Sequence, residues 1–355
     1  MTWKKIFIIV IIILFFVADF IPTIGGTNLE NMSNQEITNK NILYVGGNGE
    51  GNYTTIQDAI DNANEDDTIY VFNGIYKENI LISKNRLTLV GEDKESTIIK
   101  GDGNKHTITI ELANNVTITS FSITTEPLVS EFAGIYIYNC IDTLIQNNLI
   151  FENGQGIKCK DAQSFNISNN EIFKNIKFEW NAAGIWIESG NHWVVRKNRI
   201  YENVGGILVI GVFGNYIPSP VIECNKITDN TDSGLIFDSC KCITIQKNEI
   251  TNHYQGIFII NSHNSNLTFA FNNIIDNNLS IWILLSSGFQ FINNNIDSYN
   301  ETLIQIMTFS FSLHCNMNYW GTNKWPRLRC QPFFAPLIFF PWRIKPVDIP
   351  KCWPD

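Results

Sequence analysis

The stretch NRIYENVGGILVI, residues 198–210, places an asparagine, an isoleucine and a second asparagine ahead of a Gly-Ile pair. Its spacing fits neither an amphipathic helix nor a simply alternating strand. The pattern recurs along the chain, and successive copies start 22, 28, 27, 23, 25 and 21 residues apart. The copies start at Asn148, Asn170, Asn198, Asn225, Asn248, Asn273 and, in weaker form, Asn294. An internal repeat of this period predicts a solenoid.

The content of each copy indicates the type of solenoid. Each copy contains short runs in which Ile or Val alternates with other residues, and none contains a ten-residue amphipathic stretch for a helix. We therefore predict an all-β parallel β-helix of roughly ten coils, in which inward side chains stack about 4.8 Å apart. The first asparagine of each copy is expected to form a structural ladder, because Asn tolerates left-handed backbone at a bend and its amide can bond to neighbouring coils. His253 takes the second asparagine position of its copy.

The two ends of the repeat region differ from its middle. Thr55 lies three residues before Asp58 in YTTIQDAIDNA, which predicts a short helix that caps the first coil and protects its edge. The β-helix is expected over residues 42–316. Residues 317–355 are rich in proline and aromatic residues, which predicts a C-terminal capping tail.

The N-terminus reads MTWKKIFIIVIIILFFVADFIPTIGG, with two lysines before an apolar run over residues 6–17. This length suits a signal peptide, whereas a run that tolerates Asp19 reaches Ile24 and suits an uncleaved membrane anchor. We assign residues 1–25 to a signal peptide or anchor and residues 26–41 to a linker. Both alternatives place the rest of the chain outside the cell or at its surface, with membrane contact only through this segment.

Composition and charge narrow the class of protein. A hydrophobic fraction of 44% with 17% charged residues indicates a globular chain, and 46 asparagines agree with the repeat. The net charge is −9 and no long basic run occurs, so we expect no nucleic-acid partner. Eight cysteines are compatible with disulfides that hold the C-terminal tail, or with buried thiols. Possible N-glycosylation sites occur at Asn31, Asn52, Asn115, Asn166, Asn266, Asn278 and Asn300.

The chain resembles the right-handed parallel β-helix proteins of the pectin-lyase-like superfamily. The resemblance rests on TIQDAIDNANEDDTIYVFNGIYKENILISKNRLTLVGEDKESTIIKG (residues 55–101) and on NYWG (residues 318–321). Within the superfamily it is most similar to the NosD-like, periplasmic copper-binding-type repeat branch of exported surface proteins. The resemblance implies a right-handed β-helix. It leaves the function open, because the fold hosts lyases, hydrolases, esterases and proteins without known activity.

The Gly-Ile strand of each coil begins the sheet whose outer face holds substrate in this superfamily. Alternation places the second and fourth residues after the glycine on that outer face. The candidates for carbohydrate binding there are Tyr136, Tyr138, Lys158, Lys160, Trp186, Phe258 and Trp282. Aromatic rings with a few charges suit a sugar chain, but such side chains also pack beneath long loops. Both interpretations stay open at this point.

Two outward carboxylates, Glu188 and Asp238, are weak catalytic candidates. They lie two coils apart, at roughly 9–10 Å, which is near the upper limit for an inverting acid/base pair. Ile210 lies between them, and Lys160 can neutralise Glu188. The later catalytic segments of pectinesterases, polygalacturonases and pectate lyases have no match in this chain. We therefore expect a non-catalytic protein that binds polysaccharide or an envelope glycan, or serves as an envelope structural module. The alternative is a polysaccharide hydrolase or lyase that uses this outer face.

Cofactors and metals have little support in the sequence. The five histidines fall on different parts of different coils. We interpret Cys240 and Cys242 as a disulfide or as buried thiols and not as metal ligands. We expect no cofactor and no specific metal site. Acidic turns at residues 64–67 and 100–103 leave weak Ca²⁺ binding as an alternative.

Overall fold

The computed structural model describes residues 40–126, 132–176, 182–214, 217–299, 303–307, 313–321, 328–331, 337–338, 343 and 345–352. The signal peptide or anchor predicted for residues 1–25 lies outside this part, as does nearly all of the predicted linker. Residues 40–355 form one compact unit. In the described part, no helix is both long and apolar enough to cross a membrane.

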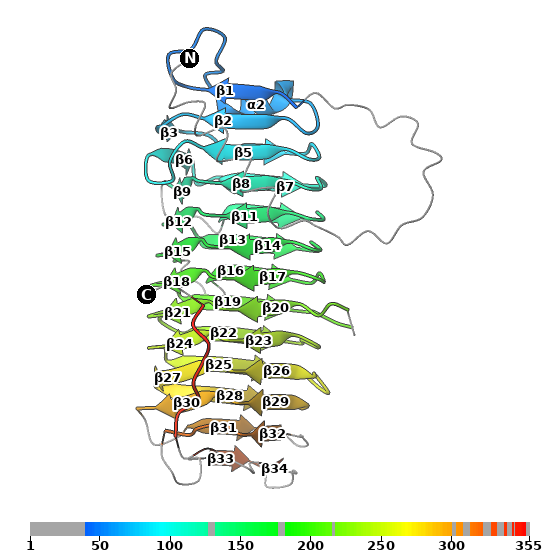
Figure 1. The fold of residues 1–355 in the computed structure, drawn as a ribbon, viewed down its shortest axis with the longest axis vertical. Helices are drawn as coiled ribbons and strands as arrows, with labels where there is room; N and C mark the ends of the chain where they lie inside the picture. Colours follow the sequence, from blue (N-terminus) through cyan, green and yellow to red (C-terminus); the bar gives the residue numbers. More distant parts are fainter. Residues whose placement is uncertain are drawn as a thin grey trace, which may run out of the picture. The chain divides into compact units, whose positions relative to one another are not determined.

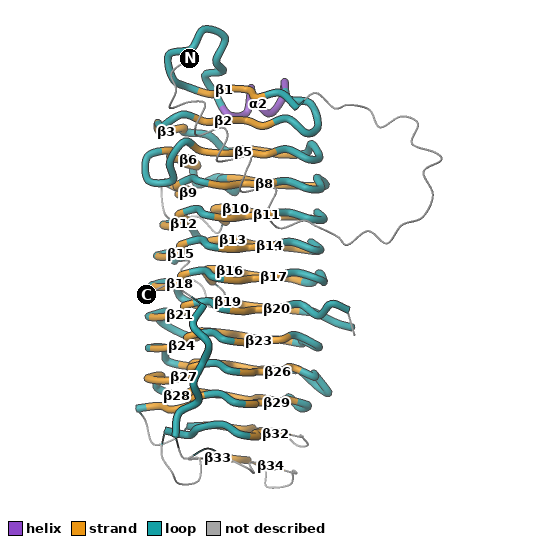
Figure 2. The backbone as a smooth tube through the Cα atoms, in the orientation of Figure 1, coloured by secondary structure: helices purple, strands orange, loops and turns teal. Residues whose placement is uncertain are grey.

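The unit is a parallel β-helix built from three sheets (Figures 1 and 2), as the sequence predicted. The 13-stranded sheet contains, in spatial order, β1 (Ile42–Val45), β2 (Thr68–Val71), β5 (Thr88–Gly91), β8 (Thr117–Thr119), β11 (Leu144–Gln146), β14 (Asn166–Ser168), β17 (Val194–Arg196), β20 (Val221–Glu223), β23 (Thr244–Gln246), β26 (Leu267–Ala270), β29 (Phe289–Ile292), β32 (Leu313–Asn316) and β34 (Leu337–Ile338). Its strands follow one another along the solenoid axis and pair in parallel.

The other two sheets complete each coil. The 11-stranded sheet contains β4 (Ile80–Ile82), β7 (Ile108–Glu111), β10 (Ala133–Tyr138), β13 (Gln155–Lys160), β16 (Ala183–Glu188), β19 (Gly205–Ile210), β22 (Ser233–Asp238), β25 (Gln255–Ile260), β28 (Leu279–Leu284), β31 (Ile304–Met307) and β33 (Leu328–Gln331). The 10-stranded sheet contains β3 (Gly74–Tyr76), β6 (Thr97–Gly101), β9 (Ser122–Thr125), β12 (Leu149–Phe151), β15 (Glu171–Phe173), β18 (Arg199–Tyr201), β21 (Lys226–Thr228), β24 (Glu249–Thr251), β27 (Asn273–Asn277) and β30 (Asn295–Ser298). These strand numbers agree with the expected coil number.

Columns of isoleucine fill the interior because side chains alternate between the two faces of each strand. Ile157, Ile185 and Ile207 are fully buried and lie in register on β13, β16 and β19. Ile172, Ile200 and Ile227 form a second buried column on the 10-stranded sheet. Each column buries apolar surface on its copies in the neighbouring coils, so the core runs the length of the solenoid.

A ladder of buried asparagines lines the turn between the 13-stranded and 10-stranded sheets. The Asn198 side-chain oxygen accepts from the backbone N and the side-chain Nδ2 of Asn170, at 3.0 and 3.1 Å. Asn198 Nδ2 donates in turn to Asn225 Oδ1 at 3.0 Å and to the Ile167 carbonyl at 2.9 Å. The same exchange joins Asn148 to Asn170 and Asn225 to Asn248. The predicted ladder is therefore confirmed for its first five members.

The sixth assignment, Asn273, is wrong by one residue. Asn272 is the ladder residue, because its Oδ1 accepts from Asn248 Nδ2 at 3.0 Å and it is fully buried. Asn273 is the first residue of β27 and is only partly buried. The ladder then continues to Asn294 and Asn318. Two adjacent asparagines made the assignment ambiguous, and only one of them has a side chain that points inward.

The left-handed backbone lies one residue before each ladder asparagine, not at the asparagine itself as expected. Asn147, Lys197 and Cys224 have φ angles of 54°, 52° and 56°. Phe271 occupies the same position before Asn272, with a φ of 57°. The turn therefore imposes this conformation on whichever residue precedes the buried amide, and that residue projects outward from the coil.

A second buried column lies at the turn from the 10-stranded to the 11-stranded sheet. Asn175 Nδ2 donates to Asn203 Oδ1 at 3.0 Å, and Asn203 Nδ2 donates to Asn230 Oδ1 at 3.0 Å. His253 takes the next position, as predicted, with its Nδ1 3.2 Å from the Asn230 backbone N. Its own backbone N donates to Asn277 Oδ1 at 3.0 Å.

The N-terminal cap has the predicted form. Helix α2 (Ile56–Asn62) begins after Thr55, whose side chain accepts from Asp58 N at 3.1 Å. Ile56, Ala59 and Ile60 face the first coil and are buried. The helix thereby covers the apolar end of the solenoid.

At the C-terminal end, strands β33 and β34 extend two sheets into the region that we assigned entirely to a capping tail. Most aromatic residues of that region lie outside the described residues. Residues 345–352 turn back along the outside of the coils (Figure 1, red). Val347 exchanges two hydrogen bonds with the Asn295 side chain.

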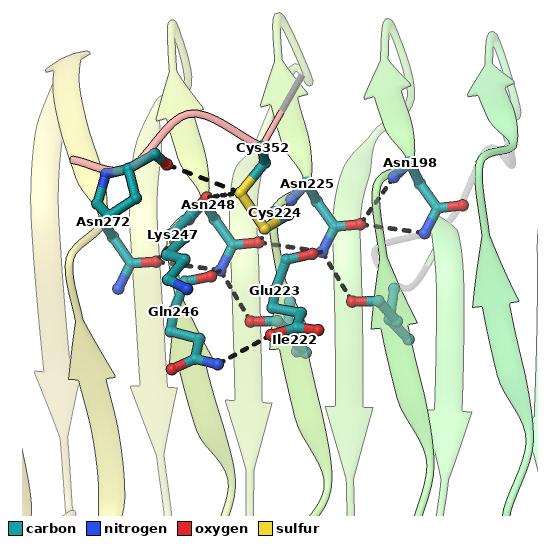
Figure 3. The surroundings of a disulfide bond; sticks show 12 residues. Asn198, Ile222, Glu223, Cys224, Asn225, Gln246, Lys247, Asn248, Asn272 and Cys352 are labelled. Atoms are coloured by element: carbon teal, nitrogen blue, oxygen red, sulfur yellow. Dashed lines mark hydrogen bonds between the residues drawn. A yellow bond between two sulfur atoms is a disulfide. The ribbon is translucent and has the colours of Figure 1, made fainter. Parts of the chain in front are cut away.

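A disulfide between Cys224 and Cys352 fastens this returning segment (Figure 3). Cys224 precedes ladder residue Asn225, so the turn projects its side chain outward toward Cys352. Cys140, Cys159, Cys240 and Cys315 are instead buried thiols, and desolvation raises the pKa of Cys240 to about 12. The sequence allowed both outcomes, and the structure contains both.

We expect Asn198→Ala to lower the free energy of unfolding by about 2–4 kcal/mol, because Asn170 loses an acceptor for two buried donors. Urea unfolding followed by circular dichroism measures this loss. Gln290→Ala is the matched control, since Gln290 is an exposed amide on β29. Equal effects of the two substitutions would show that the ladder does not stabilise the fold.

The disulfide closes a chain separation of 128 residues, so reduction should lower the thermal unfolding midpoint. Loop-closure entropy predicts a loss of about 4–5 kcal/mol. The measurement is the melting temperature with and without reductant. The Cys352→Ser variant should melt like the reduced protein and should not respond to reductant. A wild type that is indifferent to reductant would contradict the role of this bond.

Candidate functional site

The outer face of the 11-stranded sheet has the predicted composition. Tyr136, Lys158 and Trp186 lie in register on β10, β13 and β16. Tyr138, Lys160 and Glu188 form the adjacent column on the same strands. Their inward neighbours are buried, which leaves these six side chains on the outer surface. We refer to them as the β10–β16 patch.

Within this patch, the two lysines converge on one carboxylate. Lys160 Nζ lies 3.3 Å from Glu188 Oε1, and Lys158 Nζ lies 3.9 Å from Glu188 Oε2. Lys158 also lies over the Trp186 ring, 4.1 Å from its centroid. The hydrogen bond to Glu188 raises the pKa of Lys160. The patch therefore presents three aromatic rings, two cations and one carboxylate that is paired with them on a short stretch of surface.

His106 borders this patch, although the sequence did not indicate it. Its ring stacks on Tyr136 with centroids 4.4 Å apart and meets Phe132 edge-on at 5.2 Å. Its Nδ1 accepts from the Ala133 backbone N at 2.8 Å, so the ring must be neutral there. Burial, with a smaller contribution from Lys158, lowers the pKa of His106 to about 4. His106 lies just before β7, outside the repeating strand positions, so the repeat pattern could not place it beside Tyr136.

The weak catalytic candidates are held by neighbours. Glu188 pairs with Ile210, and Ile210 pairs with Asp238, so the two carboxylates lie two strands apart as expected. Glu188 is engaged by the lysines. Asp238 Oδ1 accepts from Ser239 Oγ at 2.9 Å and from Asn261 Nδ2 at 3.2 Å. Ile210 thus lies between Glu188 and Asp238, and each carboxylate has its own polar partners.

The outer face is interrupted between β16 and β25. Leu208 on β19 follows Trp186 in the column and is only 5% exposed, which fits packing beneath a loop. Farther along, Phe258 and Trp282 stack with centroids 4.7 Å apart. The structure brings together the candidates of β10, β13 and β16, and it places Phe258 and Trp282 in a separate group.

Both outward tryptophans carry an unpaired donor. The indole Nε1 atoms of Trp186 and Trp282 are buried and have no hydrogen-bond acceptor among the described residues. A ligand oxygen can meet such a donor only after small local movements. Across the described residues, no cluster of three or more His, Cys, Asp or Glu side chains has the geometry to hold a metal ion.

The neutral His106 makes the stability of this patch dependent on pH. The unfolded chain binds a proton near the ordinary value of 6.5 and the folded chain near 4, so protonation favours unfolding. Above pH 6.5 His106 is neutral in both states and the fold keeps its full stability. The free energy of unfolding decreases as the pH falls from 6.5 toward 4. Allowing for partial exposure, we expect a loss of about 1–2 kcal/mol from this group. Urea unfolding of wild type and His106→Phe at pH 7 and pH 5 isolates it, and identical pH dependence in the two proteins would contradict it.

Comparisons with known proteins agree with the β-helix architecture. The family model described as "Right handed beta helix region" matches residues 94–217 and 173–296. Probable pectinesterase 56 of Arabidopsis thaliana is 37% identical over 83 residues, 22% of this chain and 29% of that protein. Probable pectinesterase/pectinesterase inhibitor 17 of the same plant is 28% identical over 239 residues, 66% of this chain and 40% of that protein. The chain thus spans well under half the length of these relatives.

Among solved structures, the A-module of the mannuronan C-5 epimerase AlgE6 from Azotobacter vinelandii superposes with a TM-score of 0.58 at 16% identity. The match covers 80% of this chain and 93% of that one. At this identity the likeness concerns the fold alone. The two family matches together cover residues 94–296, more than half of the sequence. The chain therefore belongs to the right-handed β-helix family.

Proposed function

We propose that this protein binds polysaccharide through the outer face of its 11-stranded sheet, with the β10–β16 patch as the principal contact. The observation that carries the proposal is the in-register column of Tyr136, Lys158 and Trp186 on a rigid face. Aromatic rings contact the apolar faces of sugars, and the lysines supply donors for hydroxyl or carboxylate oxygens. Phe258 and Trp282 would form a second contact along the same face.

The arrangement of charges supports binding without turnover. Glu188 forms ion pairs with two lysines, and Asp238 accepts two hydrogen bonds. A catalytic pair needs one carboxyl with a raised pKa beside one that stays ionised, with access for water. Ile210 occupies the surface between the two carboxylates.

A polysaccharide-active enzyme is the second candidate, and the relatives named as probable pectinesterases favour it. Under this alternative the same outer face would hold the substrate and Glu188 or Asp238 would act on it. Ca²⁺ could then be required, as the acidic turns allow. The likeness to the NosD-like branch, the export signal or anchor, glycosylation and a location outside the cell or at its surface all remain predictions. A role as an envelope structural module remains the other alternative to glycan binding.

Affinity electrophoresis of the chain from about residue 27 onward, in gels containing single acidic or neutral polysaccharides, tests the binding proposal. We expect retardation in at least one gel, reduced about tenfold in affinity by Trp186→Ala and clearly weakened by Lys158→Ala. Phe173→Ala is the matched control, because Phe173 stacks between Phe151 and Tyr201 on the 10-stranded sheet. Equal losses in Trp186→Ala and Phe173→Ala would remove the outer face from the proposal.

The same polymers, incubated with the protein with and without Ca²⁺, separate binding from turnover. New reducing ends or unsaturated products that disappear in Glu188→Gln or Asp238→Asn would establish the enzyme alternative. Retardation without product supports the binding proposal. Neither retardation nor product on any polymer would leave the envelope structural module as the better description.

A further inference from the structure

A hollow of about 340 Å³ lies at the turn between the 10-stranded and 11-stranded sheets, away from the β10–β16 patch. It spans the turns that follow β21, β24 and β30, whose strands lie along one edge of the solenoid (Figure 1). Its lining residues are Asp229, Asn230, Thr231, Asn252, His253, Tyr254 and Tyr299. We propose that this hollow is a second binding site, which takes a neutral sugar residue such as a terminal or branch pyranose.

The floor of the hollow is rigid. Asn230 and His253 are buried members of the second column, and their side chains are already engaged. Asn230 Nδ2 donates to the Ile200 carbonyl at 3.2 Å. The two ring nitrogens of His253 lie 3.2 and 3.1 Å from the carbonyl oxygens of Asn230 and Ile227. These groups shape the site without being available to a ligand.

The walls carry the groups that a sugar requires. Tyr254 and Tyr299 are 59% and 70% exposed, an unusual state for two large rings at one hollow. Asp229 and Asn252 precede members of the second column in left-handed conformation, with φ angles of 57° and 64°. Their side chains therefore project outward, and Asn252 Nδ2 donates to Asp229 Oδ1. Thr231 adds a hydroxyl at the rim.

The hydrogen bond between Asn252 and Asp229 holds both side chains in place and leaves acceptor atoms for a ligand. Asp229 Oδ2 and Asn252 Oδ1 have no partner among the described residues and can accept from sugar hydroxyls. Carboxylate and amide acceptors beside aromatic rings are a pattern suited to a polyhydroxylated ring. The volume lies at the small end of the range for ligand pockets, roughly 300–1,000 Å³, which fits one or two sugar rings.

Charge selects among sugars. At the turn position equivalent to Asp229, the preceding coil carries Glu202, which lies 3.8 Å from Lys174, and the next coil carries the uncharged Asn252. Asp229 is the carboxylate of the lining, so an anionic sugar would meet unfavourable charge in the hollow. The lysines of the β10–β16 patch lie on β13 of the 11-stranded sheet and are not part of the lining of the hollow. A neutral residue suits the hollow, whereas the patch accommodates either charge type.

Saturation-transfer NMR on the protein with millimolar glucose, galactose, mannose, xylose and glucuronate tests the proposal. At least one neutral sugar should receive saturation from the wild type, and Tyr254→Ala or Tyr299→Ala should weaken its binding about tenfold. Tyr254→Phe should retain binding through its ring. Asp229→Asn should relieve the exclusion of glucuronate, a change that a purely structural role of Asp229 would not produce.

Phe173→Ala is the matched control, because its ring stacks on the 10-stranded sheet outside both the hollow and the β10–β16 patch, and it should leave this binding unchanged. No saturation transfer to any neutral sugar, equal transfer in wild type and Tyr254→Ala, or Ca²⁺ binding in place of sugar would each overturn the proposal. Failure here is distinguishable from failure of the outer face, because polymer retardation that is sensitive to Trp186→Ala can persist without monosaccharide binding in the hollow.

Discussion

A buried primary amide has two donors and one acceptor, and leaving any of them unpaired costs about 1–3 kcal/mol. In this protein the amide of one ladder residue is satisfied by the next coil and by backbone carbonyls. Asn198, for example, bonds to Asn170 on one side and to Asn225 on the other. A coil that slipped by one residue would leave these groups unpaired and would turn its isoleucines outward. The ladder therefore fixes the register of the coils, and the columns on the outer surface depend on that register.

The ladder and the second buried column also determine which side chains project outward. The residue before each buried amide takes left-handed backbone and projects its side chain away from the core, as Cys224 does before Asn225 and Asp229 before Asn230. One such position forms the disulfide to the returning C-terminal segment, and another forms a wall of the hollow between the 10-stranded and 11-stranded sheets. The turn constrains only the backbone conformation of these positions. Their side chains can therefore differ from coil to coil and can serve in a disulfide or a binding site.

Much of this could be predicted from the sequence because it depends on local periodicity. Alternation along the Gly-Ile strand was sufficient to place Tyr136, Lys158 and Trp186 in one column. The asparagine motif gave a wrong assignment at Asn273, because two adjacent asparagines fit it. The spacing to the glycine position distinguishes them: Asn148 and Asn198 lie eight residues before Gly156 and Gly206, as Asn272 does before Ser280. Contacts between segments outside the repeat, such as His106 on Tyr136, follow no period. The pairing of Cys352 could not be predicted either, because cysteine spacing says nothing about where a returning tail lies.

The two proposed sites differ in how the scaffold supports them. On the outer face, a sugar chain can lie across successive strands, so rings repeated at one position on each coil can contact successive residues of a polymer. The hollow collects side chains from three turns, with Tyr254 and Tyr299 from coils that are not adjacent, and its volume suits one or two sugar rings. A β-helix with a fixed register can hold both sites without loss of stability. The aromatic rings of the two sites and Asp229 take no part in the buried hydrogen-bond columns. Substitutions at either site should therefore alter recognition while leaving the solenoid folded, which makes the sites separable by experiment.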